Sequence, residues 1–221
     1  MEPPYKIPGT KITSPYPVKL TPAETRLVFS LEKIFDPQNI LVDCYFPKPD
    51  SNPNSRYIKN HVVSDAELLQ IDCLAIDERG IFIFESKGYL GWIYGHGNRV
   101  HWTQVSAYGK NKHQFYSPVR QNASHVAAIA TIFGTIVPLY SIIVFGGDVT
   151  LKVIDNLPPD CHVCTQAELT ATLDGAVSPR PPFSPQQVID IRNKLDASRV
   201  NPTTIIRDEH ISEVEDYKSL I

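Results

Sequence analysis

The sequence has few cysteines and no long hydrophobic run, and each shortage excludes a class of protein. Four cysteines in 221 residues do not form a dense disulfide framework, and Cys73 lies in an apolar stretch, which favours a reducing compartment. The longest apolar segment, around 129–145, is interrupted by Gly134, Pro138 and Tyr140, so we expect no membrane-spanning helix. The N-terminal segment lacks the hydrophobic core of a signal peptide. We therefore expect a soluble, cytoplasmic protein with no membrane partner.

Acidic residues are missing from the middle of the chain, although the net charge is −3. No Asp or Glu occurs between Glu85 and Asp148, where even spacing would place roughly seven. The same stretch holds both tryptophans and four of the seven histidines. Its candidate phosphate contacts are Arg99, Lys110, Lys112, His113 and Arg120. The alternative interpretation is a chance distribution around a buried core.

The apolar pattern divides the chain into a folded region and two appendages. Residues 1–22 are proline-rich and predict an extended arm, 47–60 predict a polar loop, and 201–221 predict a polar tail. We expect a core over 23–147 that later elements over 148–200 complete. The predicted helices are 23–35, 118–133, 166–173 and 185–197, and the predicted strands are 40–46, 68–76, 81–87, 89–94, 99–104, 141–145 and 149–154. This order predicts a mixed α/β fold.

Three charged side chains occur on two consecutive predicted strands. Asp72 lies within one strand, and Glu85 and Lys87 end the next strand. Because side chains alternate along a strand, Glu85 and Lys87 point to one face, together with two isoleucines. If a turn at 77–80 joins the two strands, residues whose numbers sum to about 157 lie opposite each other. Asp72 would then lie beside Glu85.

Two carboxylates and an ammonium group in one cleft suit metal-assisted phosphoryl chemistry. Carboxylate oxygens are hard ligands suited to Mg²⁺, and Mn²⁺ accepts the same ligands. A metal held there would polarise a phosphoryl oxygen and activate a water molecule for attack. Lys87 could orient or deprotonate that water, and the carbonyl group of Ser86 could be a further ligand. The spacing by itself is common, so the alternative is an exposed hairpin that carries a surface salt bridge.

Further pieces of sequence occur in a specific order around these residues. They are Glu24 in the first helix, Gln70-Ile71-Asp72, Gly80-Ile-Phe-Ile-Phe-Glu85-Ser-Lys87, Gly91-Trp-Ile-Tyr-Gly95, Trp102-Thr-Gln104 and Pro118-Val-Arg-Gln121-Asn122. In this order the chain resembles the nuclease-related domain family, a branch of the PD-(D/E)xK superfamily, from Glu24 to about residue 129. Ala23, Gly88 and Ser117 depart from the residues usual in the family, but none of these changes removes a charged group.

The resemblance implies a restriction-endonuclease-like fold, with a mixed central sheet flanked by helices. It implies metal-dependent hydrolysis of phosphodiester bonds in DNA, with RNA as the alternative substrate. Asp72, Glu85 and Lys87 are the implied catalytic core, Glu24 an auxiliary acid and metal ligand, and Gln121 a supporting polar residue. Glu24 could instead only cap its own helix.

The competing hypothesis is a module on the same fold that binds nucleic acid or a partner protein without cleavage. A homodimer or larger assembly, or a partner protein bound through the arm or the tail, also fits the sequence.

Three other patterns have structural interpretations. Cys161 and Cys164 have the spacing of a zinc half-site, but structural zinc needs four ligands, so we interpret them as semi-buried thiols. The four histidines of the acid-free stretch are interpreted as phosphate contacts or structural residues. The aromatic residues Tyr89, Trp92, Tyr94 and Trp102 are interpreted as core residues, and stacking on unpaired bases is the alternative.

Overall fold

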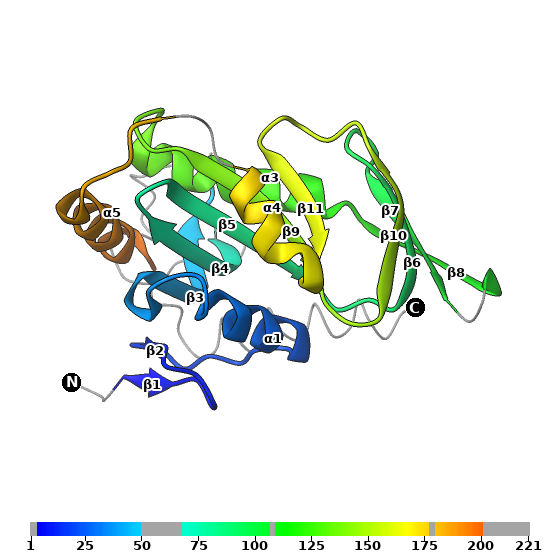
Figure 1. Cartoon of the computed structure of the whole chain (residues 1–221), viewed down its shortest axis with the longest axis horizontal. Coiled ribbons are helices and arrows are strands. Elements are labelled where there is room, and N and C mark those ends of the chain that lie inside the picture. Colours follow the sequence, from blue (N-terminus) through cyan, green and yellow to red (C-terminus); the bar gives the residue numbers. More distant parts are fainter. Residues whose placement is uncertain (1–3, 50–67, 107–108, 177–179, 201–221) are drawn as a thin grey trace.

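The computed structural model describes residues 4–49, 68–106, 109–176 and 180–200 (Figure 1). The predicted tail at 201–221 and most of the predicted loop at 47–60 lie outside the described residues. The elements are β1 (Tyr5–Lys6), β2 (Thr13–Ser14), α1 (Pro22–Leu31), η1 (Pro37–Asn39), β3 (Ile40–Pro47), β4 (Leu68–Asp77), β5 (Gly80–Lys87), β6 (Gly91–His96), β7 (His101–Ser106), β8 (Asn111–Tyr116), α3 (Pro118–Phe133), β9 (Leu139–Phe145), β10 (Val149–Asp155), β11 (Cys161–Thr165), η4 (Gln166–Glu168), α4 (Leu169–Gly175) and α5 (Pro185–Ser198).

A five-stranded sheet forms the centre of the molecule, with the strand order β11-β9-β5-β4-β3. Strands β3, β4 and β5 are antiparallel neighbours, whereas β5, β9 and β11 run parallel. Helices α1 and α4 cover one face, and α3 and α5 cover the other. The mixed sheet between two helical layers confirms the predicted α/β class and has restriction-endonuclease-like architecture.

Strand β5 explains why both faces of this sheet are covered. Its odd-numbered Ile81 and Ile83 pack under α3 and α5, while Phe82 and Phe84 pack under α1 and α4. All four side chains are fully buried, and each such burial stabilises the fold by roughly 1.5–3 kcal/mol. A strand that is apolar on both faces needs a helical layer on each side.

A second sheet, with the order β10-β6-β7-β8, packs beside the central one. Its inner face carries Trp102 and Phe115, which pack against Phe145 of β9. Gly95 is required here because a Cβ atom at this position would lie 2.4 Å from the Trp102 ring. In Figure 1 this sheet lies at the right-hand end, and the β7–β8 hairpin projects from it.

Helix α3 begins and ends where the sequence predicts. Ser117 is its N-cap and accepts a hydrogen bond from the N–H of Arg120, Pro118 occupies the first turn, and Gly134 follows its last residue with φ 60°. Proline fits the first turn because its missing N–H has no helical partner there, and glycine adopts a positive φ at little cost. The first helix is shorter than predicted. Helix α1 ends at Leu31, and residues 32–35 form tighter turns before Asp36 and Pro37.

Four strands were not predicted from the sequence, and two of them, β1 and β2, lie in the segment predicted as an extended arm. Strand β8 is an edge strand whose sequence, Asn-Lys-His-Gln-Phe-Tyr, contains mostly polar side chains and gives little apolar alternation. Strand β11 contains Cys161 and Cys164, which are buried in different clusters on opposite sides of the central sheet. These two thiols therefore cannot bind one zinc ion together, and their structural interpretation is confirmed, with more complete burial than expected.

The N-terminal arm is folded against the body over its described part. Strands β1 and β2 pair as a short hairpin, and Ile7 and Ile12 between them are 2% exposed. Both side chains join the cluster beneath α1. None of the helices in the described part of the chain has the length and apolar character needed to cross a membrane.

Candidate active site

The predicted pairing of β4 with β5 is confirmed and brings Asp72 beside Glu85. The structure pairs Cys73 with Phe84, so the next positions in the same register are Asp72 and Glu85. The backbone N–H of Ser86 donates a hydrogen bond of 2.7 Å to Asp72 Oδ2. This bond fixes the Asp72 carboxylate at the point where β5 leaves the hydrophobic core.

Glu85 and Lys87 project from β5 toward the start of α3. Lys87 Nζ donates hydrogen bonds to Glu85 Oε1 at 2.5 Å and to Gln121 Oε1 at 2.9 Å. Glu85 is 1% exposed, and Lys87 is partly exposed. The structure therefore brings together four of the predicted site residues, since Gln121 is tied to Lys87 and Lys87 to Glu85.

A buried polar network behind Glu85 is a feature that the sequence reasoning missed. Asn122 Nδ2 donates to the Ile83 carbonyl oxygen and to Ser141 Oγ, both at 2.9 Å, so Asn122 Oδ1 must face His125. His125 Nδ1 lies 3.2 Å from Asn122 Oδ1 and 3.6 Å from Glu85 Oε2. An amide oxygen only accepts, so Nδ1 carries the proton.

Burial makes His125 a structural member of this network. It lowers the pKa of His125, and the nearby Glu85 carboxylate offsets this only in part. The imidazole is therefore neutral near pH 7. The signal available in the sequence was helical spacing, because Asn122 and His125 are three residues apart in α3 and occupy one face.

The site holds more negative than positive charge. Burial, followed by the charges of Glu85 and Glu24, raises the pKa of Asp72 well above its usual value, despite Lys87 and the Ser86 hydrogen bond. Burial alone would lower the pKa of Lys87, but Glu85 and Asp72 outweigh it and raise that pKa. Lys87 therefore stays an ammonium ion among three mutually repelling carboxylates.

Glu24 caps its own helix and also acts electrostatically on Asp72. It closes a capping box at the start of α1, because Thr21 N donates to Glu24 Oε2 at 2.7 Å and Glu24 N donates to Thr21 Oγ1 at 3.3 Å. Its negative charge also contributes to the raised pKa of Asp72, which places it within electrostatic reach of the cluster. Capping is thus present, and metal binding by Glu24 stays a prediction.

The donor set suits a hard divalent cation. Glu85 Oε2 is buried and accepts no hydrogen bond within the described residues, which is costly for a carboxylate oxygen unless a cation lies beside it. Asp72 supplies a second carboxylate, and the Ser86 carbonyl belongs to the residue directly after Glu85. Among the described residues no three His, Cys, Asp or Glu side chains form a ready-made cage. Mg²⁺ fits such a set because it keeps several waters and takes only one or two carboxylates.

Asp43 on β3 is a second feature that the sequence did not reveal. It lies opposite the position of Asp72, between the Val42–Cys73 and Cys44–Ile71 pairs, is 6% exposed, and has φ 50° within a strand. Gln70 Nε2 donates a 2.9 Å hydrogen bond to its carboxylate. Val42 packs under α1 and Cys44 under α3, although alternation would place them on one face. The left-handed backbone conformation of Asp43 therefore changes which face of the sheet the following residues of β3 point to, at a position beside Asp72.

The predicted nucleic-acid contacts do not form one cluster. Lys112 and His113 are consecutive on β8 and therefore face opposite sides of its sheet, while Lys110 lies just before this strand. Arg99 is exposed in the turn before β7. Arg120 is exposed in the first turn of α3, next to Gln121. Of the five predicted contacts, Arg120 is the residue next to a catalytic candidate, Gln121. The binding role of all five residues stays a prediction.

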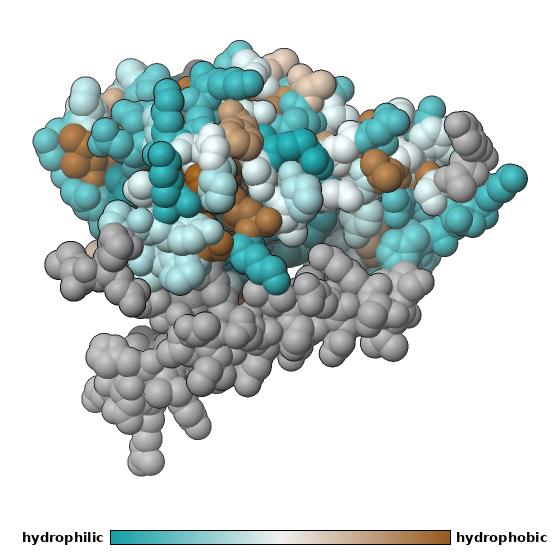
Figure 2. All heavy atoms as spheres, turned by 90° about the horizontal axis from the view of Figure 1, so that it is seen from below, coloured by the Kyte–Doolittle hydropathy of each residue, from teal (hydrophilic) through white to brown (hydrophobic). Residues whose placement is uncertain are grey.

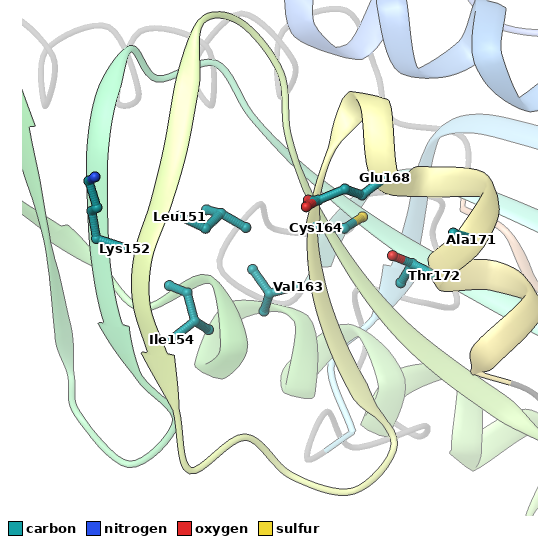
Figure 3. A pocket seen from close by; sticks show the side chains of 8 residues that line it. All are labelled: Leu151, Lys152, Ile154, Val163, Cys164, Glu168, Ala171 and Thr172. Atoms are coloured by element: carbon teal, nitrogen blue, oxygen red, sulfur yellow. The ribbon is translucent and has the colours of Figure 1, made fainter.

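Two surface depressions lie away from this cluster. One, of about 590 Å³, lies between β10 and β11 and beside α4; Figure 3 shows Leu151, Ile154 and Val163 pointing into it. The other, of about 720 Å³, is lined by residues including Arg79 and Phe183. Neither contains Asp72, Glu85 or Lys87. The candidate active site is therefore a cluster at the end of β5, separate from both hollows.

Comparison with known proteins agrees with the class that fold and site define, a restriction-endonuclease-like α/β protein with an acidic cluster and a lysine. The family model of the nuclease-related domain matches residues 21–146, more than half of the chain. The chain belongs to the nuclease-related domain family. It is also 31% identical over 126 residues to the uncharacterized protein pXO1-01 of Bacillus anthracis, an alignment that spans 56% of this chain and 58% of that relative. No solved structure matches the chain.

Proposed function

We propose that this protein is a divalent-metal-dependent nuclease that hydrolyses phosphodiester bonds of nucleic acid. The observation that carries the proposal is the convergence of Asp72, Glu85 and Lys87 at one end of β5, where the Ser86 N–H fixes Asp72 and Lys87 bonds Glu85. A surface salt bridge would not need a 1% exposed glutamate with an oxygen that accepts no hydrogen bond from the described residues. Membership of the nuclease-related domain family supports the same function.

Asp72 and Glu85 would hold the metal, with the Ser86 carbonyl and Glu24 as further ligands. When bound, Mg²⁺ or Mn²⁺ supplies Lewis-acid chemistry at the phosphoryl group. The protein side chains provide orientation and charge. His125, which Asn122 orients, lies 3.6 Å from Glu85 Oε2 and packs behind this carboxylate, which would limit its reorientation.

Lys87 would act as a hydrogen-bond donor. Its raised pKa favours the ammonium form, which can orient the attacking water or offset negative charge on the transition state. The same shift argues against Lys87 as the group that removes the proton from that water. Gln121 would keep Nζ in place, because its amide oxygen accepts one of the three Lys87 protons.

The test is cleavage of labelled single-stranded and double-stranded DNA and RNA with Mg²⁺, Mn²⁺ or EDTA. We expect at least one substrate to be cut with metal, and no cleavage with EDTA or in Asp72→Ala. Asp190→Asn is the matched control, since Asp190 is an exposed carboxylate on α5. Cleavage by Asp72→Ala in EDTA would refute the mechanism. Tight metal-dependent binding of nucleic acid without cleavage would favour the non-cleaving module instead.

A further inference from the structure

The β10-β6-β7-β8 sheet has an outer face that points away from the central sheet. Its inner face carries Ile93, Trp102 and Phe115, all buried, so the alternate residues of each strand point outward. The backbone register arranges these residues in three rows across the four strands, which we call the outer face. The rows are Thr150, Trp92, Val105 and Lys112; Val153, Tyr94, Thr103 and Gln114; and Asp155, His96, His101 and Tyr116.

The outer face exposes aromatic rings that a protein core would cover. Trp92 is 38% exposed and Tyr116 is 50% exposed, whereas Trp102 on the inner face is 1% exposed. Tyr94 lies two residues from Trp92 on β6, so the two rings start about 7 Å apart along the strand. Exposed rings on a flat sheet offer surfaces on which unpaired bases stack, and stacking does not depend on base identity.

The charge of the outer face also suits a nucleic acid. Lys112 lies in the row of Trp92, and Lys152 Nζ, at the irregularity of β10, lies 4.9 Å from the centre of the Trp92 ring. The three rows contain a single acid, Asp155, which is 3.9 Å from His96 at the far end from Lys112. In Figure 2 the right-hand end of the molecule, where the β7–β8 hairpin projects, is hydrophilic, with separate apolar patches.

We propose that the outer face binds single-stranded nucleic acid, with bases stacked on Trp92 and Tyr116 and phosphates held by Lys112 and Lys152. The proposal rests on the proposed nuclease function and specifies its substrate class. Bases of a duplex are already stacked and paired, so the rings would contribute nothing to duplex binding.

The chain connects the outer face to the candidate active site. Tyr116 ends β8, the next residue caps α3, and α3 carries Gln121, which bonds Lys87. A strand bound across the outer face and past Tyr116 can therefore continue toward the carboxylates. In this arrangement the outer face would bind the strand, and the carboxylate cluster would cleave it.

The two tryptophans allow a direct test of binding without activity. In the Glu85→Gln variant, which should not cleave, we expect a single-stranded oligonucleotide to quench the fluorescence of exposed Trp92. Buried Trp102, whose indole N–H donates to the His96 carbonyl, should be unaffected. Trp92→Ala and Tyr116→Ala should each weaken single-strand binding roughly 10-fold, and Trp92→Phe should largely restore it because the ring is kept. The control is Tyr5→Ala, an exposed aromatic residue on β1.

Three results would overturn the proposal. Unchanged affinity in both alanine variants, with normal folding by circular dichroism, would show that the rings do not stack on bases. Equal binding of a duplex of the same sequence, weakened equally by Trp92→Ala, would show a different mode of contact. A change from dimer to monomer in Trp92→Ala, without loss of single-strand binding, would assign the face to a second copy of the chain. In each case, metal-dependent cleavage by the unmodified protein would leave the proposed nuclease function standing.

Discussion

The two sheets differ in how many of their faces are covered, and the proposed metal site and the proposed strand-binding face lie on different sheets. The central sheet is covered on both sides, and β5 is buried along its length until Ser86. The charged residues of β5, Glu85 and Lys87, occur only at the end of this strand, where neighbouring residues exclude water and fix their side chains. The smaller sheet packs on the central sheet through one face, with Ile93, Trp102 and Phe115, and most of the other residues of β6 and β7 are partly or fully exposed. Desolvation strengthens electrostatic catalysis, whereas exposure is needed to bind a long polymer.

The largest effect should come from the buried end of the central sheet. Lys87→Ala should reduce cleavage by about two to four orders of magnitude, because an electrostatic or proton-donating group is lost from the transition state. Metal affinity, measured by calorimetry, should remain nearly normal in this variant. Asp72→Asn and Glu85→Gln should instead weaken metal binding. If Lys87→Ala cleaves as fast as the unmodified protein, the assignment of this lysine is wrong.

A second, smaller effect should come from the residues around this cluster. Gln121→Ala should slow turnover roughly 10-fold with little change in metal affinity, because it removes the acceptor that holds Lys87 Nζ. Glu24→Gln should raise the Mg²⁺ concentration needed for half-maximal rate. If Glu24 only caps α1, Glu24→Gln should keep normal activity because its amide oxygen still accepts the Thr21 N–H, whereas Glu24→Ala should lose about 1 kcal/mol of stability. Measuring melting temperature and Mg²⁺ dependence on the same preparations separates the two roles.

The exposed basic residues should have a modest effect that does not depend on sequence. Charge reversal of Lys112, Lys110 or Arg120 should weaken binding several-fold, and each lost phosphate contact should flatten the salt dependence by about 0.7–0.9 in log–log slope. Lys33→Glu, at an exposed position beyond the end of α1, is the control. If Lys112→Glu flattens the slope and Lys110→Glu does not, strand binding follows the outer face. Unchanged slopes in all three variants would place the bound strand elsewhere.

The features predictable from sequence were those that depend on local pattern and pairing. The apolar row of β5 and the turn at its start fixed the register, so Asp72 could be placed opposite Glu85. The proline and glycine at the ends of α3 fixed its boundaries. By contrast, the positive φ of Asp43 and the bond from Asn122 to the Ile83 carbonyl depend on strands and helices far apart in sequence. No periodicity of residue types encodes such contacts.

The smallest predicted effect concerns stability and tests whether the buried carboxylates repel each other. The pKa of Asp72 is raised above its ordinary value of 3.8, so folding favours its neutral form. Its contribution is therefore fully present below about pH 4 and is lost as the pH rises through the folded-state pKa. In EDTA at pH 7, Asp72→Asn should be more stable than the unmodified protein by on the order of 1 kcal/mol, or about 2–4 °C in melting temperature.

The pH and metal dependence of this difference make the test specific to the charge of Asp72. The amide oxygen introduced by Asp72→Asn can still accept the hydrogen bond from the Ser86 N–H, so the substitution removes mainly the charge. The difference in stability should shrink as the pH falls below 3.8, the ordinary pKa of this group, because Asp72 then becomes neutral in both the folded and the unfolded chain. Adding Mg²⁺ should reverse the order, because a cation that binds only the folded state stabilises the unmodified protein more than the variant. A variant that is less stable than the unmodified protein in EDTA at every pH would show that the Asp72 carboxylate is already compensated and needs no metal.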